Sequence, residues 1–158
     1  MGKEALSSAF SEMILEEAKK DKDIVVVCTD SRGSAKLGAY PDEVPEQFVE
    51  MGIAEQNSVT VSAGMAYMGK KVFTIGPASF YSMRSAEQVK VDVAYSHNNV
   101  TVIGISGGIS YGALGATHHS LQDISLMRAI PGLTVMIPSD AVQMRKITKE
   151  LLESPRPT

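Results

Sequence analysis

The side chains best suited to chemistry are an acid, a histidine and two aromatic rings. Glu55 lies in the segment 52–57 (GIAEQN), and His118 ends a run of glycine and small residues. Phe80 and Tyr81 follow a short β-branched and aromatic run. Each group comes after a predicted strand, and ligands of open α/β sheets bind beyond the carboxyl ends of the strands. The sequence therefore predicts that these groups share one site.

Glycine is concentrated in residues 106–119, which contain Gly107, Gly108, Gly112 and Gly115. Glycine costs backbone entropy, so such a run indicates that the main chain approaches a ligand closely. The pair Gly107-Gly108 lacks the G-x-G-x-x-G spacing, and no helix follows it directly. A nicotinamide-type dinucleotide site is therefore disfavoured.

Composition excludes several classes of function. The chain has 158 residues, 44% hydrophobic and 21% charged, with a net charge of −3, which does not suit a nucleic-acid-binding surface. Cys28 is the single cysteine, and with three scattered histidines it forms no metal-binding pattern. No apolar run reaches the roughly 20 residues that cross a bilayer, and the charged N-terminus is unlike a secretory signal. We expect a cytoplasmic protein with no metal ligand, nucleic acid or membrane partner.

Helical and strand patterns alternate along the whole chain. Strands alternating with helices predict an α/β fold, with three α/β/α layers around a mostly parallel central sheet. Residues 1–158 are predicted to form a single domain, and the Pro-rich end at 154–158 suggests truncation before a further C-terminal domain. The predicted helices are 6–18, 57–68, 82–95, 121–129 and 141–152 (capped by Ser139 or Asp140), and the predicted strands are 24–27, 72–75, 100–105 and 133–137.

Four elements resemble one enzyme superfamily, in its order and spacing. Residues 52–57 resemble the G-I-[RAS]-E-[HQ] element of thiamine-diphosphate enzymes, and residues 115–119 (GATHH) resemble its G-x-[ST]-H-[QH] element. Residues 127–140 (MRAIPGLTVMIPSD) are similar to a block shared by transketolases and deoxyxylulose-phosphate synthases. Residues 80–89 (FYSMRSAEQV) are similar to the matching helix start in those enzymes and in 2-oxoacid dehydrogenase β subunits. The nearest resemblance is to the pyrimidine-binding domain of a transketolase, as in the C-terminal subunit of a split enzyme.

The resemblance implies roles for the acid and the aromatic rings. Glu55 would hydrogen-bond N1′ of the aminopyrimidine of thiamine diphosphate and set its tautomer, while the cofactor supplies the reactive carbon. From the pattern alone, Glu55 could equally be an acid at a helix N-terminus. Phe80 and Tyr81 are the candidates to stack on the pyrimidine, with Tyr81 preferred because its register continues into the helix. Either ring could instead belong to the core.

Further residues match substrate-side positions of the family. Asp30 matches a position near the thiazolium, Ser34 one near the sugar-phosphate donor, and His118 a histidine that hydrogen-bonds substrate oxygens. The chain departs from many transketolases at two further positions. Leu114 stands where they have the acid of a Glu-Asp pair, and Ser106 stands where they have a histidine. We expect both departures to alter which donor is used.

The resemblance also implies partners. The diphosphate and its Mg²⁺ would be held by a G-D-G…N domain of another chain, so thiamine diphosphate would be shared at an interface. We expect a homodimer, a separate N-terminal transketolase subunit, or both, acting on sugar phosphates; alone, the chain should be inactive. The alternatives are a deoxyxylulose-phosphate synthase, a 2-oxoacid dehydrogenase β-like component, or a non-catalytic interaction module of the same fold.

Overall fold

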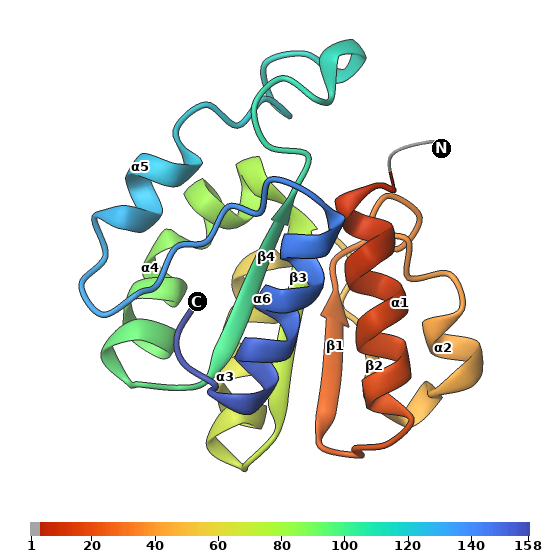
Figure 1. Ribbon diagram of the computed structural model, residues 1–158. Helices are drawn as coiled ribbons and strands as arrows, with labels where there is room; N and C mark the ends of the chain where they lie inside the picture. Colours follow the sequence, from red (N-terminus) through yellow and green to blue (C-terminus); the bar gives the residue numbers. More distant parts are fainter. Residues whose placement is uncertain (1–3) are drawn as a thin grey trace.

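A computed structural model describes residues 4–158, and its centre is a parallel four-stranded sheet (Figure 1). The strand order is β2-β1-β3-β4, and every ladder between neighbouring strands is parallel. The strands are β1 (Ile24–Cys28), β2 (Phe48–Glu50), β3 (Lys71–Pro77) and β4 (Val100–Ile105). This confirms the predicted α/β class.

Helices cover both faces of the sheet. On one face, α1 (Leu6–Ala18) and α6 (Ala141–Glu153) lie side by side (Figure 1). On the other face, α3 (Glu55–Tyr67) packs beside the helical segment that follows β3. The remaining helical elements are short: α2 (Tyr40–Glu43), η1 (Pro45–Gln47), η4 (Gly112–Leu114) and α5 (Asp123–Arg128).

The two faces of β1 carry separate cores, because successive side chains of a strand point to opposite faces. Ile24 and Val26 pack with the α1 and α6 side chains, whereas Val25 and Val27 pack against α3. All five residues of β1 are buried, as expected for a strand covered on both sides. The three-layer arrangement predicted from the sequence follows from this division.

The helix predicted for 82–95 begins earlier and is wound more widely. It consists of η2 (Phe80–Arg84), α4 (Ala86–Gln88) and η3 (Val89–Tyr95), and both η segments are π-helical. Wide π-helical turns are uncommon and occur frequently at functional sites. At the last helix, Asp140 is the N-cap: its carboxylate accepts a hydrogen bond from the N–H of Gln143 at 2.8 Å.

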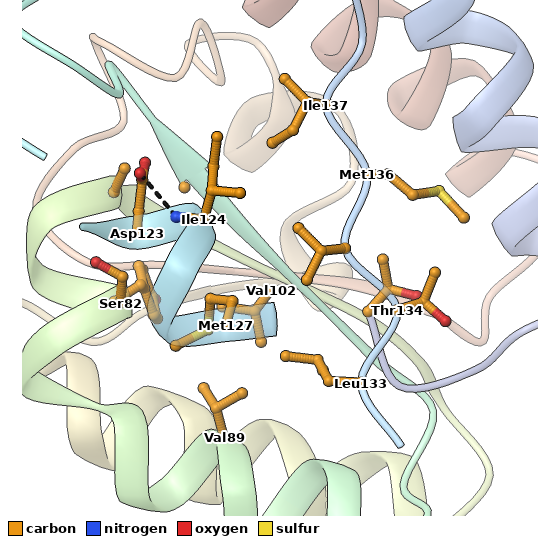
Figure 2. A pocket seen from close by; sticks show the side chains of 15 residues that line it. Ser82, Val89, Val102, Asp123, Ile124, Met127, Leu133, Thr134, Met136 and Ile137 are labelled. Atoms are coloured by element: carbon orange, nitrogen blue, oxygen red, sulfur yellow. Dashed lines mark hydrogen bonds between the residues drawn. The ribbon is translucent and has the colours of Figure 1, made fainter. Parts of the chain in front are cut away.

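The strand predicted for 133–137 is not formed, and the backbone hydrogen bonds give the reason. Thr158 occupies the edge of β4: its N–H donates to Val100 and its carbonyl accepts from Val102. Thr134 donates instead to the carbonyl of Pro157. Residues 133–137 therefore run as a separate segment, and a mainly apolar groove lies between them, β4 and α5 (Figure 2).

Candidate active site

The candidate site lies beyond the carboxyl ends of the strands, where the loops after β1, β2, β3 and β4 begin. Glu55 is the first residue of α3 and is 1% exposed. The Arg84 guanidinium donates to Oε2 of Glu55 at 2.5 Å. Oε1 of Glu55 takes part in no hydrogen bond found among residues 4–158. One oxygen of a buried carboxylate is thus held by a cation, and the other is left for a ligand.

Arg84 also contacts the more accessible aromatic ring. Its guanidinium carbon lies 4.4 Å from the centroid of the Phe80 ring, a cation–π distance. The π-helical turn Phe80–Arg84 places these two side chains on the same side. Sequence reasoning missed Arg84; its position four residues after Phe80, in an element already singled out, was the available signal.

His118 approaches the same ring edge-on. Its imidazole centroid lies 5.1 Å from that of Phe80 and 5.7 Å from that of Tyr111. The Thr117 hydroxyl lies 3.0 Å from Nδ1 of His118. The structure therefore brings together Glu55, Arg84, Phe80 and His118, as a chain of contacts running from a buried acid to a half-buried histidine.

Tyr81 turns the opposite way from Phe80. It is 2% exposed, and its hydroxyl lies 2.7 Å from the Ser58 hydroxyl and 2.8 Å from that of Thr74. Burial raises the pKa of the Tyr81 phenol, although both hydroxyls act against the shift. A Cβ at Gly76 would come within 2.5 Å of the Tyr81 ring, so only glycine lets the ring lie there. The accessible aromatic of the pair is Phe80, against the preference given to Tyr81 by register.

The loop after β1 is tied to the turn that precedes Glu55. Oε1 of Glu50 accepts hydrogen bonds from the N–H of Asp30 at 2.8 Å and of Gly52 at 3.1 Å. Asp30 has a φ of 45°, in the left-handed region that residues other than glycine seldom adopt. Such positions persist where surrounding contacts enforce them, and they cluster at functional sites.

The other predicted substrate residues lie on exposed or half-buried loops. Ser34 is exposed in the turn after β1, and its side chain makes no hydrogen bond among those found in residues 4–158. Ser106 follows β4 with a φ of 57°, and Leu114 is 54% exposed in η4. The structure gives no contact joining these three residues to Glu55, so their roles stay predictions.

Two searches of the described chain bear on other functions. Within residues 4–158, no group of three or more His, Cys, Asp or Glu side chains could hold a metal ion. In the same part of the chain, no helix has the length and apolar character needed to cross a membrane.

Comparison with known proteins agrees with this geometry. An acid at a strand-to-helix junction beside an open aromatic ring, on a three-layer α/β fold, defines a pyrimidine-binding domain of the thiamine-diphosphate type. Residues 3–158 match the family "Transketolase, pyrimidine binding domain", and the chain belongs to that family.

Among curated relatives, an apulose-4-phosphate transketolase subunit of Phocaeicola vulgatus is 58% identical over 153 residues, covering 97% of this chain and 49% of that protein. The 6-deoxy-6-sulfo-D-fructose transketolase subunit SqwH of a Clostridium species is 37% identical over 147 residues (93% and 46%). A 1-deoxy-D-xylulose-5-phosphate synthase of Mycolicibacterium vanbaalenii is 35% identical over 147 residues (93% and 23%). The chain thus spans about half the length of the split-transketolase relatives it matches.

Among solved structures, a split-gene transketolase described as an inactive β4 tetramer is 33% identical, with a TM-score of 0.86 over 99% of this chain and 50% of that one. A Pichia stipitis transketolase with sedoheptulose 7-phosphate has a TM-score of 0.87 at 19% identity, over 99% of this chain and 25% of that one, which supports the fold alone. These matches confirm the transketolase resemblance and the fold.

Proposed function

We propose that this domain is the pyrimidine-binding part of a split transketolase, which transfers a two-carbon ketol unit between sugar phosphates through thiamine diphosphate. The observation that carries the proposal is the Glu55 carboxylate, which is 1% exposed and, within residues 4–158, has one oxygen bound by Arg84 and the other without a partner. A buried carboxylate of this kind is suited to share a proton with a ring nitrogen. A surface acid at a helix start would not need to be buried.

The residues present fit the pyrimidine half of the cofactor. Oε1 of Glu55 would bind N1′ of the aminopyrimidine, and the open face of Phe80 offers an apolar surface for the ring. When bound, thiamine diphosphate supplies the carbon that attacks the donor carbonyl. His118, next to Phe80, would hydrogen-bond substrate oxygens, and Asp30 would face the thiazolium side.

A partner chain is part of the proposal. We infer that a separate subunit holds the diphosphate and its Mg²⁺, because the curated relatives named as subunits of split transketolases match over this domain. The β4 tetramer of the split-gene relative is inactive by its own description, which supports the expectation that this half alone does not catalyse. The further C-terminal domain and the cytoplasmic location stay predictions.

For the donor, we propose a ketose phosphate other than xylulose 5-phosphate. Leu114 and Ser106 replace the polar groups of many transketolases, and two similar proteins are named for unusual donors, apulose 4-phosphate and 6-deoxy-6-sulfo-D-fructose. Apulose 4-phosphate is the first compound to test, because that relative shares 58% identity. The alternative is a deoxyxylulose-phosphate synthase, which the 35% identical relative supports.

The test is reconstitution. The full polypeptide carrying this domain would be mixed with the subunit that carries the G-D-G…N motif, thiamine diphosphate and Mg²⁺. We expect ketol transfer from apulose 4-phosphate or another ketose phosphate to an aldose phosphate, and none from either subunit alone. Release of CO₂ from pyruvate with formation of deoxyxylulose 5-phosphate would establish the alternative. A stable complex that binds thiamine diphosphate but turns over neither class of donor would contradict both, and would indicate an interaction module.

A further inference from the structure

We propose that Arg84 is a positioning residue for the reaction: it fixes the Glu55 carboxylate so that only Oε1 meets the cofactor ring. The inference rests on the proposed function of Glu55. It goes beyond it because neither the sequence motifs nor the chemistry of the acid requires a cation at this place.

The first support is the environment of the acid. Glu55 is almost entirely enclosed, and a buried charge is stable only when it is paired and hydrogen-bonded. Arg84 is the one cation paired with Glu55 among residues 4–158, at 2.5 Å. The arginine side chain itself is 42% exposed, so the pair joins the interior to the mouth of the site.

The second support is the asymmetry of the contact. The guanidinium binds Oε2, and Oε1 has no partner within residues 4–158. A carboxylate free to rotate would offer either oxygen at varying angles, whereas a short charge-assisted hydrogen bond to one oxygen fixes the other. Orientation of this kind contributes to rate because a small misplacement of a reacting group is costly.

The third support is the bridge to the aromatic ring. The same guanidinium lies over Phe80 at 4.4 Å, and the π-helical winding of Phe80–Arg84 sets both side chains on one side. Arg84 therefore sets the spacing between the acid and the candidate stacking surface. Lysine cannot reproduce this, because it lacks the planar group that stacks on a ring while donating to a carboxylate.

The experiment is a cycle of four proteins in the reconstituted complex: unmodified, Arg84→Gln, Glu55→Gln and the double variant. If Arg84 acts through Glu55, Arg84→Gln lowers kcat about 10- to 100-fold but adds no further loss to Glu55→Gln. Arg84→Lys should recover only part of the rate. Lys149→Gln, which changes an exposed cation on α6, should leave kcat unchanged.

Two readouts separate positioning from stability and from cofactor affinity. The affinity for thiamine diphosphate, measured by calorimetry, should change less than about fivefold in Arg84→Gln. The crystal structure of that variant without cofactor should show the Glu55 carboxylate turned from its present position. Arg84→Lys, which keeps the charge, serves the same comparison if Arg84→Gln does not fold.

The outcomes are distinguishable. Multiplying losses in the double variant, or a kcat close to that of the unmodified complex for a folded Arg84→Gln protein, would overturn the role of Arg84. If Glu55→Gln itself leaves kcat unchanged, the proposed function of Glu55 fails, and the inference about Arg84 fails with it.

Discussion

The backbone N–H of Asp30 donates to the Glu50 carboxylate at 2.8 Å, and this bond holds Asp30 at a positive φ of 45°. The same carboxylate oxygen binds the N–H of Gly52 at 3.1 Å, three residues before Glu55. Glu50, at the end of β2, thus connects the loop after β1 to the turn that leads into α3. Neither the Asp30 loop nor the Glu55 turn is positioned independently of the other.

Glu50→Ala should therefore lower the free energy of unfolding by about 1–2 kcal/mol, since two charge-assisted bonds at an exposed site are lost. Glu50→Gln keeps an acceptor oxygen and should cost less than half as much. Urea unfolding followed by circular dichroism would measure both, with the exposed Glu46→Ala as the matched control. Equal stability of Glu50→Ala and Glu46→Ala would show that Glu50 does not support the two loops.

Glu55→Gln, in the reconstituted complex, should keep the fold and lower kcat by about 10²–10⁴-fold, the range for loss of an acid–base group. The amide is isosteric but cannot share a proton with a ring nitrogen in the same way. Steady-state kinetics at saturating cofactor would measure the loss, and Glu153→Gln, an exposed acid at the end of α6, provides the control. Turnover close to that of the unmodified complex would assign Glu55 a structural role.

Tyr40→Phe should leave the protein as stable as before or raise the free energy of unfolding by up to about 2 kcal/mol at neutral pH. The Tyr40 hydroxyl is buried and has no hydrogen-bond partner among residues 4–158, and burying such a group is unfavourable. Denaturant unfolding at pH 7 would measure the change. A clear loss of stability would show that the hydroxyl makes a favourable contact.

The same residue predicts a pH dependence. Burial raises the pKa of the Tyr40 phenol well above its ordinary value. A raised pKa in the folded state means that the stability is fully present below about pH 10, the pKa of an unfolded tyrosine, and is lost as pH rises further. Tyr40→Phe should make this alkaline loss smaller, whereas Tyr95→Phe, at an 80% exposed position, should not. Identical alkaline unfolding in both variants would rule out this source of the loss.

Leu114→Asp should shift donor preference towards xylulose 5-phosphate in the reconstituted complex. Leu114 cannot accept a hydrogen bond, and burying a sugar hydroxyl against it costs roughly 1–3 kcal/mol, or about 5- to 150-fold in kcat/KM. The ratio of kcat/KM for xylulose 5-phosphate and apulose 4-phosphate should rise by a factor in that range. If the unmodified enzyme already uses xylulose 5-phosphate as well as it uses any donor, Leu114 does not set the preference.

Self-association should depend on the far end of α3. Tyr67 and Met68 are 81% and 78% exposed, whereas Met51 and Met65 are half-buried against Val25 and its neighbours. Ile53 is also exposed but lies at the other end of α3, so these residues do not form one cluster as the sequence suggested. Tyr67→Lys should weaken dimer formation by about tenfold or more in sedimentation equilibrium, and Val142→Lys on α6 should not. A monomeric unmodified chain at high concentration would remove the basis for this interface.

The fold was readable from the sequence because local pattern and burial agree. The run 24–27 has no polar alternation, and β1 is indeed buried on both faces. The run 133–137 has the same strand-like composition, but composition does not specify a neighbour. Only the bonds from Thr158 to Val100 and Val102 show that this edge of β4 is already taken.

The site was readable in part. Glu55 was identifiable because its motif sits at a strand-to-helix junction. Arg84 was missed, since an ion pair between residues 29 positions apart leaves no local pattern. The orientation of Phe80 and Tyr81 depends on a π-helical turn, and one residue of helical offset exchanges the open ring for the buried one. The positive φ of Asp30 depends in the same way on Glu50, which lies 20 residues later.

The position of β1 in the sheet has a consequence during synthesis. β1 pairs only with strands that come later, β2 and β3, and its fully buried residues have no earlier partner in the sheet. Between Cys28 and the end of β3 at Pro77 the ribosome must add 49 residues (77 − 28), which takes roughly 2–10 s at about 5–20 residues per second. Throughout that interval, Ile24–Cys28 is an apolar, β-branched segment whose sheet is incomplete. The nascent chain is therefore most open to chaperone binding and to misassociation with neighbouring chains before β3 has emerged.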